Sequence, residues 1–158
     1  MEAFLFKQIA FVRAQILKLL DDVSEEMADQ IPEGFRNNIH WNLGHIYIIL
    51  ERFAFHFLNL PEQLPDGFKE QFAIGSSPLT TPDTVPVPSF QELKILLQEQ
   101  PERIRVALAQ RLQEKIDPPY TTSSGMTLET PEQFLIFGIY HEAQHLNTIK
   151  YYKKVLSH

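Results

Sequence analysis

Apolar residues recur three or four positions apart in four stretches of this chain, which is the spacing of one face of an α-helix. In the first stretch these residues are Leu5, Ile9, Val12, Ile16, Leu19 and Leu20. The pattern predicts an amphipathic helix over roughly residues 2–22. Ser24 can cap a short turn that follows this helix, and Pro32 and Gly34 end that turn.

The second stretch, "NNIHWNLGHIYIILERFAFHFLNL", predicts a helix from about Asn38 until Pro61, because proline cannot continue a helix. Residues 60–88 then hold eight prolines and glycines, which indicate a long connection. A connection of this length inside a compact domain is usually functional or mobile. We expect Phe68 and Phe72 to anchor its first half.

Two capping signals begin the remaining helices. Ser89, with Glu92 three residues later, forms a capping box that predicts a third helix reaching about Gln113. Pro101 must kink or divide that helix. Thr130 as the N-cap, followed directly by proline, predicts a fourth helix that reaches Leu156.

Four long helices with no alternating strand pattern and no internal repeat predict an all-α fold, an antiparallel four-helix bundle. The length of 158 residues, of which 44% are hydrophobic, suits a single domain over residues 1–158. The 29-residue connection between the second and third helices is long enough to cross the bundle. A simple up-and-down order is therefore not required.

Composition excludes several functions. The net charge is −6 and no Lys/Arg block occurs, so nucleic acid is not expected as a partner. The chain has no cysteine, which excludes disulfides and a protein thiol nucleophile, so a metal must be bound by His, Asp or Glu. The N-terminal stretch has neither signal-peptide features nor an uninterrupted apolar span. A cytoplasmic protein without membrane contact is expected.

The stretch "HEAQH" carries the candidate chemistry. His141 and His145 are four residues apart, so they lie on one face of the fourth helix with β-carbons about 6 Å apart, as two ligands of one metal would. The alternative is that each imidazole is hydrogen-bonded in the core. Other residues on this face are mostly apolar, and an unpaired ring nitrogen there would cost about 1–3 kcal/mol. A metal or a hydrogen-bond partner must therefore bind the ring nitrogens of both histidines.

The same letters match the H-E-x-x-H motif of zinc proteases, but the chain lacks the rest of such a site. These enzymes take a third ligand from beyond the motif. Only 13 residues follow His145, and they contain no acid and no glycine turn, only the terminal His158. We therefore do not expect a protease, and we expect Glu142 to be solvated or to lie between helices.

A third ligand must come from upstream, and the face of the second helix selects His45. His40 lies about 140° away from His45 around that helix, and His56 lies roughly 16 Å further along its axis. Trp41, Ile48, Ile49 and Arg52 share the His45 face. We assign Trp41 no catalytic role.

Glycines beside these histidines point to closely packed elements. Gly44 precedes His45, and Gly138 lies one turn before His141. Each costs about 1 kcal/mol of helix propensity relative to alanine, and each can let another helix approach closely. We expect the site to lie at a helix crossing.

Together, "HWNLGHIYIILERF" and "FGIYHEAQHLNTIKYY" resemble the DinB superfamily, also called DinB/YfiT-like. The resemblance spans nearly the whole chain and implies a four-helix bundle that binds a divalent metal. It further implies that one histidine of the second helix and an H-x-x-x-H pair of the fourth are the ligands. Carried over, these are His45, His141 and His145, and Glu142 falls at a position that the family leaves variable.

Three neutral imidazoles leave positions open for water or substrate, as in a reactive metal site. The resemblance implies relatives that join low-molecular-weight thiols, such as bacillithiol or mycothiol, to electrophiles. The leading hypothesis is a metal-dependent thiol S-transferase with a small-molecule substrate, in which the thiol enters as cosubstrate. Alternatives are a metal-dependent hydrolase and a non-catalytic metal or small-molecule binding module. Zinc or nickel is the expected ion, although cobalt and copper suit such ligands too.

The fourth helix also suggests an assembly. Its N-terminal half is apolar around most of its circumference: Phe134, Leu135, Ile136, Phe137, Ile139 and Tyr140. Either the 60–88 connection or a partner subunit must shield part of this surface. The family resemblance favours a homodimer.

Overall fold

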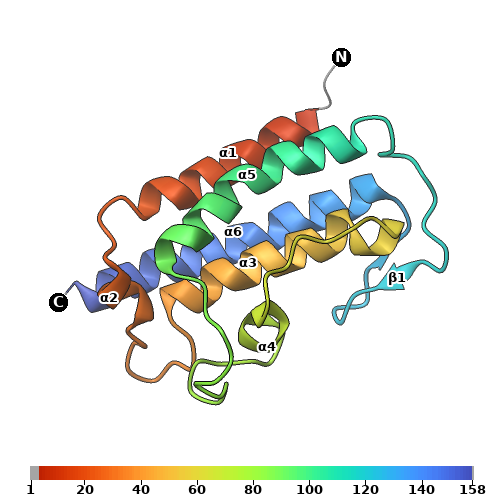
Figure 1. Cartoon of the computed structure of the whole chain (residues 1–158). Helices are drawn as coiled ribbons and strands as arrows, with labels where there is room; N and C mark the ends of the chain where they lie inside the picture. Colours follow the sequence, from red (N-terminus) through yellow and green to blue (C-terminus); the bar gives the residue numbers. More distant parts are fainter. Residues whose placement is uncertain (1–3, 158) are drawn as a thin grey trace.

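The computed structural model describes residues 4–157. Their long helices are α1 (Phe4–Leu19), α3 (Ile39–Ala54), α5 (Phe90–Leu108) and α6 (Pro131–Leu156) (Figure 1). Shorter elements are α2 (Glu25–Asp29), the 3₁₀ helix η1 (His56–Leu58), α4 (Phe68–Phe72), β1 (Tyr120–Thr121) and β2 (Thr127–Leu128). The all-α prediction is confirmed. The two short strands, which the sequence did not predict, pair antiparallel in a small hairpin. None of the helices in the described range is long and apolar enough to cross a bilayer.

The long helices pack in a ring, in which α1 and α3 each contact both α5 and α6. Figure 1 shows that α1 and α6 run in one direction and that α3 and α5 run in the opposite direction. The expected antiparallel order therefore holds for α1 beside α5 and for α3 beside α6, but it is wrong for the pairs α3–α5 and α1–α6. The connection after α3 carries the chain back to the end at which α3 began, and this makes parallel neighbours possible.

The predicted helix starts are confirmed by their caps. The Ser24 hydroxyl accepts from the backbone N–H of Met27, and Ser89 and Glu92 form the complete capping box. The Thr130 hydroxyl caps α6, with proline at its first position. Each cap satisfies a backbone donor that the helix leaves unpaired, typically worth about 1 kcal/mol.

Two predicted helix ends are wrong. The helix expected to reach Pro61 ends at Ala54, and a short 3₁₀ turn follows it until Asn59 takes a left-handed conformation with φ 53°. This residue redirects the chain before proline is reached. The helix expected to reach about Gln113 ends at Leu108, and Pro101 does not divide it.

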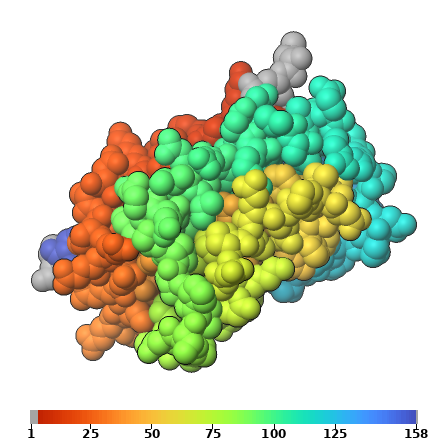
Figure 2. All heavy atoms as spheres, viewed as in Figure 1, coloured from red at the N-terminus to blue at the C-terminus, as the bar shows by residue number. Residues whose placement is uncertain are grey.

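The 60–88 connection covers one side of α3. Phe68 and Phe72, at the two ends of α4, are 1% and 3% exposed, so the prediction that they anchor this segment is confirmed. The two rings pack edge to face with their centroids 5.2 Å apart, and α4 contacts α3. Figure 2 shows the connection, in yellow to light green, lying across this face of the molecule.

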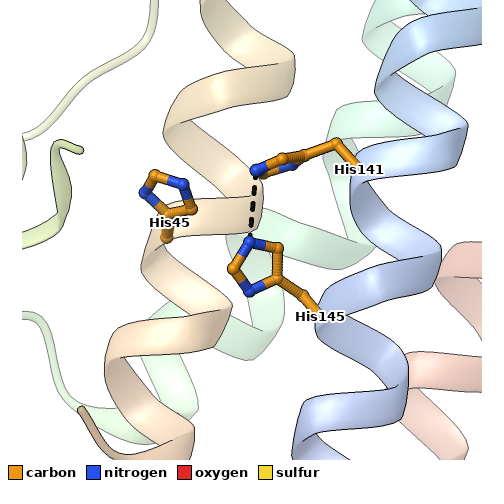
Figure 3. A group of neighbouring side chains, drawn as sticks. All are labelled: His45, His141 and His145. Atoms are coloured by element: carbon orange, nitrogen blue, oxygen red, sulfur yellow. Dashed lines mark hydrogen bonds between the residues drawn. The ribbon is translucent and has the colours of Figure 1, made fainter. Parts of the chain in front are cut away.

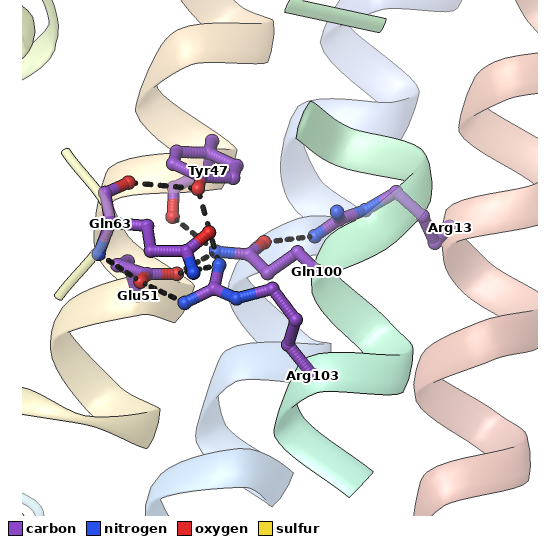
Figure 4. A network of polar contacts seen from close by, with 6 residues as sticks. All are labelled: Arg13, Tyr47, Glu51, Gln63, Gln100 and Arg103. Atoms are coloured by element: carbon purple, nitrogen blue, oxygen red, sulfur yellow. Dashed lines mark hydrogen bonds and ion pairs between the residues drawn. The ribbon is translucent and has the colours of Figure 1, made fainter. Parts of the chain in front are cut away.

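A buried polar network joins all four long helices. Arg13 of α1, 1% exposed, forms an ion pair with Glu142 of α6 and donates to Gln100 Oε1 of α5 at 3.0 Å. The Gln100 amide nitrogen in turn donates to the Tyr47 carbonyl of α3 at 2.9 Å and to Glu51 Oε2 at 2.8 Å (Figure 4). Burial, and then the nearby Glu51 carboxylate, raise the pKa of Tyr47 to about 12.

The network also holds the long connection. Glu51 is fully buried and pairs with Arg103 of α5 at 2.7 Å, and its Oε1 atom accepts from the backbone N–H of Gln63 at 2.6 Å. The Tyr47 hydroxyl donates to the Gln63 carbonyl at 2.8 Å. The start of the connection is thus fixed to α3 by a backbone donor and a backbone acceptor of one residue.

Loss of one partner of the buried Arg13–Glu142 pair should be strongly destabilising. Arg13→Met leaves the Glu142 carboxylate uncompensated, and we expect the free energy of unfolding to fall by about 3–5 kcal/mol. Arg111→Met, which breaks an exposed pair with Glu114, should cost about 1 kcal/mol or less. Urea unfolding measures both changes. Equal effects of the two substitutions would contradict a structural role for the pair.

Candidate metal centre

Three histidines from two helices meet at one point. His45 projects from the middle of α3, and His141 and His145 project toward it from successive turns of α6 (Figure 3). Their candidate ligand atoms all lie within 4.8 Å of one another, and Nε2 of His141 is 3.1 Å from Nε2 of His145. The structure therefore brings together all three histidines that the sequence predicts as ligands.

The spacing suits a divalent cation. Ring nitrogens bind zinc at about 2.0–2.1 Å, and two of them at tetrahedral angles lie about 3.3 Å apart. The Nε2 atoms of His141 and His145 are already near this separation. Imidazole, a borderline ligand, suits zinc, nickel and copper.

Hydrogen bonds on the outer side of two rings fix which nitrogen faces inward. His45 Nδ1 lies 2.7 Å from the backbone oxygen of Phe72, and His145 Nδ1 lies 2.8 Å from Oδ1 of Asn42. The Asn42 amide nitrogen donates to the Asn38 carbonyl, which confirms that its oxygen faces the histidine. Both acceptors require a proton on Nδ1, so the Nε2 lone pairs of His45 and His145 point into the cluster. This is the outer-shell pattern of metal-bound histidines.

Neighbouring side chains hold His45 in place. The Trp41 indole stacks on its ring at 4.6 Å with an interplanar angle of 10°, and Trp41 donates to the Ser76 hydroxyl at 2.9 Å. Phe72, whose carbonyl anchors the ring, packs directly against Gly44. A β-carbon at Gly44 would lie 2.4 Å from the Phe72 ring, so only glycine lets α4 come this close.

The two glycines thus serve different contacts. Gly138 admits α3, because a β-carbon there would lie 2.8 Å from Leu50 Cδ1. Gly44 admits α4 of the long connection rather than α6. The expected close approach of another helix is therefore confirmed at both glycines, by α3 at Gly138 and by α4 at Gly44.

Burial keeps the three imidazoles neutral. Burial lowers the pKa of His141 to about 4, and the charge of a protonated His45 would lower it further. Burial likewise lowers the pKa of His145 to about 3, with charge repulsion from His141 and His45 as the smaller causes. The pKa of His45 is lowered by burial against the opposing effect of its bond to Phe72. Neutral imidazole is the form that binds metal.

The remaining candidates lie elsewhere. His40 is buried with Nδ1 2.7 Å from Asp29 Oδ1, and His56 is exposed and lies 3.3 Å from Glu62. Glu142 is turned away from the cluster and buried against Arg13, which confirms the expectation that it lies between helices. The terminal histidine lies outside the described residues.

Sequence reasoning did not find the groups that orient the rings. Asn42 lies three residues before His45 in the sequence, but its bond to His145 joins residues 103 positions apart. Phe72 acts through its backbone carbonyl, for which a sequence carries no signal.

Comparisons with known proteins add the family. The family model of the DinB superfamily matches residues 8–149. Among solved structures, the crystal structure of a conserved protein from Enterococcus faecalis has a TM-score of 0.72 and 14% sequence identity, over 99% of this chain and 98% of that chain. At this identity the likeness concerns the fold alone. A search of curated proteins finds no match.

The three histidines should bind a metal as a unit. Replacing His45, His141 or His145 by alanine should each reduce bound metal from about one equivalent to nearly none, because two remaining donors hold an ion poorly against water. His40→Ala and His56→Ala serve as matched controls and should keep the metal. Elemental analysis of purified variants measures this. Retention of metal by His45→Ala together with its loss from His56→Ala would overturn the assignment.

Stability should depend on metal and pH together. The folded-state pKa values of His141 and His145 lie below the unfolded value of about 6.5, so their contribution is complete above pH 6.5 and is lost as pH falls toward about 4 and about 3. Protonation also expels a bound ion. Metal-loaded protein should therefore melt about 5–10 °C above chelator-treated protein at pH 8, and this difference should shrink steeply toward pH 5.

Thermal melts at matched protein concentration measure the difference. Core histidines without a metal function would give no chelator-sensitive difference at any pH. Its absence at pH 8, in protein already known to contain metal, would contradict coupling of the site to the fold.

Proposed function

This chain belongs to the DinB superfamily, and from that premise we propose that it is a metal-dependent enzyme that transfers a low-molecular-weight thiol to an electrophile. We propose further that its long helices form the four-helix bundle of that family, with zinc or nickel held by His45, His141 and His145. The observation that carries the proposal is the convergence of three imidazoles, two of which are fixed in the metal-binding tautomer by Phe72 and Asn42.

Three nitrogen donors leave room for a further ligand, which supports a reactive rather than a purely structural site. A divalent cation bound there would act as a Lewis acid and lower the pKa of a thiol beside it. The protein contributes neutral, preoriented imidazoles, and the Trp41 ring shields the His45 ring from water on one face. The chain has no cysteine of its own, so the sulfur must arrive with the cosubstrate.

The position of Glu142 favours thiol transfer over hydrolysis. A hydrolase that activates water commonly needs a carboxylate or histidine base within hydrogen-bond reach. Glu142, the acid next to His141 in the sequence, forms the buried ion pair with Arg13 and so is not placed to act as that base. A thiol needs no such base once it binds as thiolate.

Metal-loaded protein should conjugate thiols to electrophiles. We expect turnover of at least one small thiol with a haloalkyl, epoxide or nitroaryl electrophile, and a loss of at least about 100-fold in His45→Ala. The measurement is a screen of zinc- and nickel-loaded protein against several thiols. The Arg111→Met variant, which leaves the histidine cluster intact, is the control. Metal-containing protein that turns over no thiol with any ion would leave a non-catalytic binding module as the function.

We also propose a homodimer built on exposed apolar residues of two neighbouring helices. On α6, Ile136 and Tyr140 are 55% and 58% exposed, and on α1, Phe4 and Phe11 are 70% and 64% exposed. The two helices contact each other, so these exposed side chains lie on neighbouring elements. An apolar surface of this kind is typical of a subunit interface.

Sedimentation at micromolar concentration should give the mass of a dimer, about twice 18.4 kDa. Tyr140→Lys with Phe11→Glu should shift the protein toward monomer, because charge at a paired apolar surface opposes association. A protein that sediments only as monomer would refute the dimer.

A further inference from the structure

A pocket opens on the face of α3 that carries His45. Its volume is ≈ 400 Å³, in the range of small-ligand pockets, and its lining includes Ile48, Ile49, Arg52, Lys69, Ala73 and Ile74. Ile48 and Ile49 lie one helical turn beyond His45, and Arg52 lies two turns beyond it. Ala73 directly follows Phe72, whose carbonyl binds the His45 ring. The pocket therefore lies on the same face of α3 as His45, beside the segment whose carbonyl binds the His45 ring.

Arg52 stands out by its lack of an acidic partner. Its guanidinium carbon lies 5.2 Å from the ring centroids of both Phe57 and Tyr120, and within residues 4–157 no carboxylate or other acceptor pairs with it. Arg13 and Arg103, in contrast, each pair with a buried glutamate. A guanidinium contacts aromatic rings mainly through its planar faces, while its five N–H donors lie in the plane. The rings thus orient Arg52 and leave its donors for a ligand.

The other charges of the pocket favour an anion. Lys69 adds a second cation to the lining. The acid of the lining, Glu62, lies 3.3 Å from His56 Nδ1 and so has its own partner. Along α3, Ile48 and Ile49 lie between His45 and Arg52 and offer an apolar surface.

We propose that this pocket binds the carboxylate of a small substrate through Arg52, with the apolar part of the substrate on Ile48 and Ile49. The inference deepens the proposed function and rests on it in one respect, that the histidine cluster is the reactive centre. Seven residues separate Arg52 from His45, which corresponds to about 10 Å along the helix. The substrate class is therefore a carboxylic acid whose reacting atom lies on the order of 10 Å from its carboxylate.

Hexanoate and its neutral analogue hexanamide test the carboxylate subsite on metal-loaded protein by calorimetric titration. We expect hexanoate to bind at least about tenfold more tightly than hexanamide, the factor of a charge-assisted hydrogen bond. Arg52→Gln should lower the affinity for hexanoate at least about tenfold and leave that for hexanamide unchanged. Arg111→Gln removes the same charge away from the pocket and should change neither.

Arg52→Lys keeps a cation on the same stem and should retain part of the preference for hexanoate, which covers the case that Arg52→Gln does not fold. Equal binding of hexanoate and hexanamide, or equal hexanoate binding by the wild type and Arg52→Gln, overturns the inference. Titration of chelator-treated protein should give the same hexanoate affinity, because the carboxylate binds Arg52 and not the metal. Arg52-dependent hexanoate binding by metal-loaded protein that turns over no thiol keeps the pocket and removes the reactive centre, whereas metal-dependent thiol turnover without carboxylate preference does the opposite.

Discussion

The buried pair of Arg13 and Glu142 is the interaction on which the rest of the structure depends. Isolated charges cannot remain in an apolar interior, so the two side chains must meet, and their meeting fixes how α6 is rotated against α1. Gln100 extends the contact to α3 through Tyr47 and Glu51. Once Glu142 is turned inward toward α1, the adjacent His141, about 100° away around the helix, must face α3. The network thereby determines where the histidines point.

The long connection completes the centre from the opposite side. The backbone of Gln63 is hydrogen-bonded to the side chains of Tyr47 and Glu51. Further along the connection, α4 places the Phe72 carbonyl within hydrogen-bond distance of the His45 ring. The same segment lines the pocket that contains Arg52. The core, the histidine cluster and the pocket that contains Arg52 are thus linked, because each is positioned by the element before it.

The sequence predicts what depends on local rules. The caps at Ser24, Ser89 and Thr130 could be read directly, and helical geometry alone separated His45 from His40 and His56. The end of α3 could not be predicted, since the backbone leaves helical geometry at Phe55, where neither glycine nor proline stands. Asn59 then ends the 3₁₀ turn in a left-handed conformation that asparagine tolerates but does not require. Arg13 is one of the polar residues that interrupt the apolar N-terminal stretch. Its burial depends on partners 87 and 129 residues away, which no local pattern contains.

The central claim is that His45, His141 and His145 hold one divalent cation through Nε2, and anomalous diffraction tests it most directly. Crystals of the protein as purified, measured above and below the absorption edge of the metal found by elemental analysis, locate the ion without assumptions about function. We expect a single strong anomalous peak about 2.0–2.2 Å from all three Nε2 atoms, with the Nδ1 bonds to Phe72 and Asn42 preserved. An anomalous peak elsewhere, or density showing the three rings bonded only to one another and to water, would contradict the account.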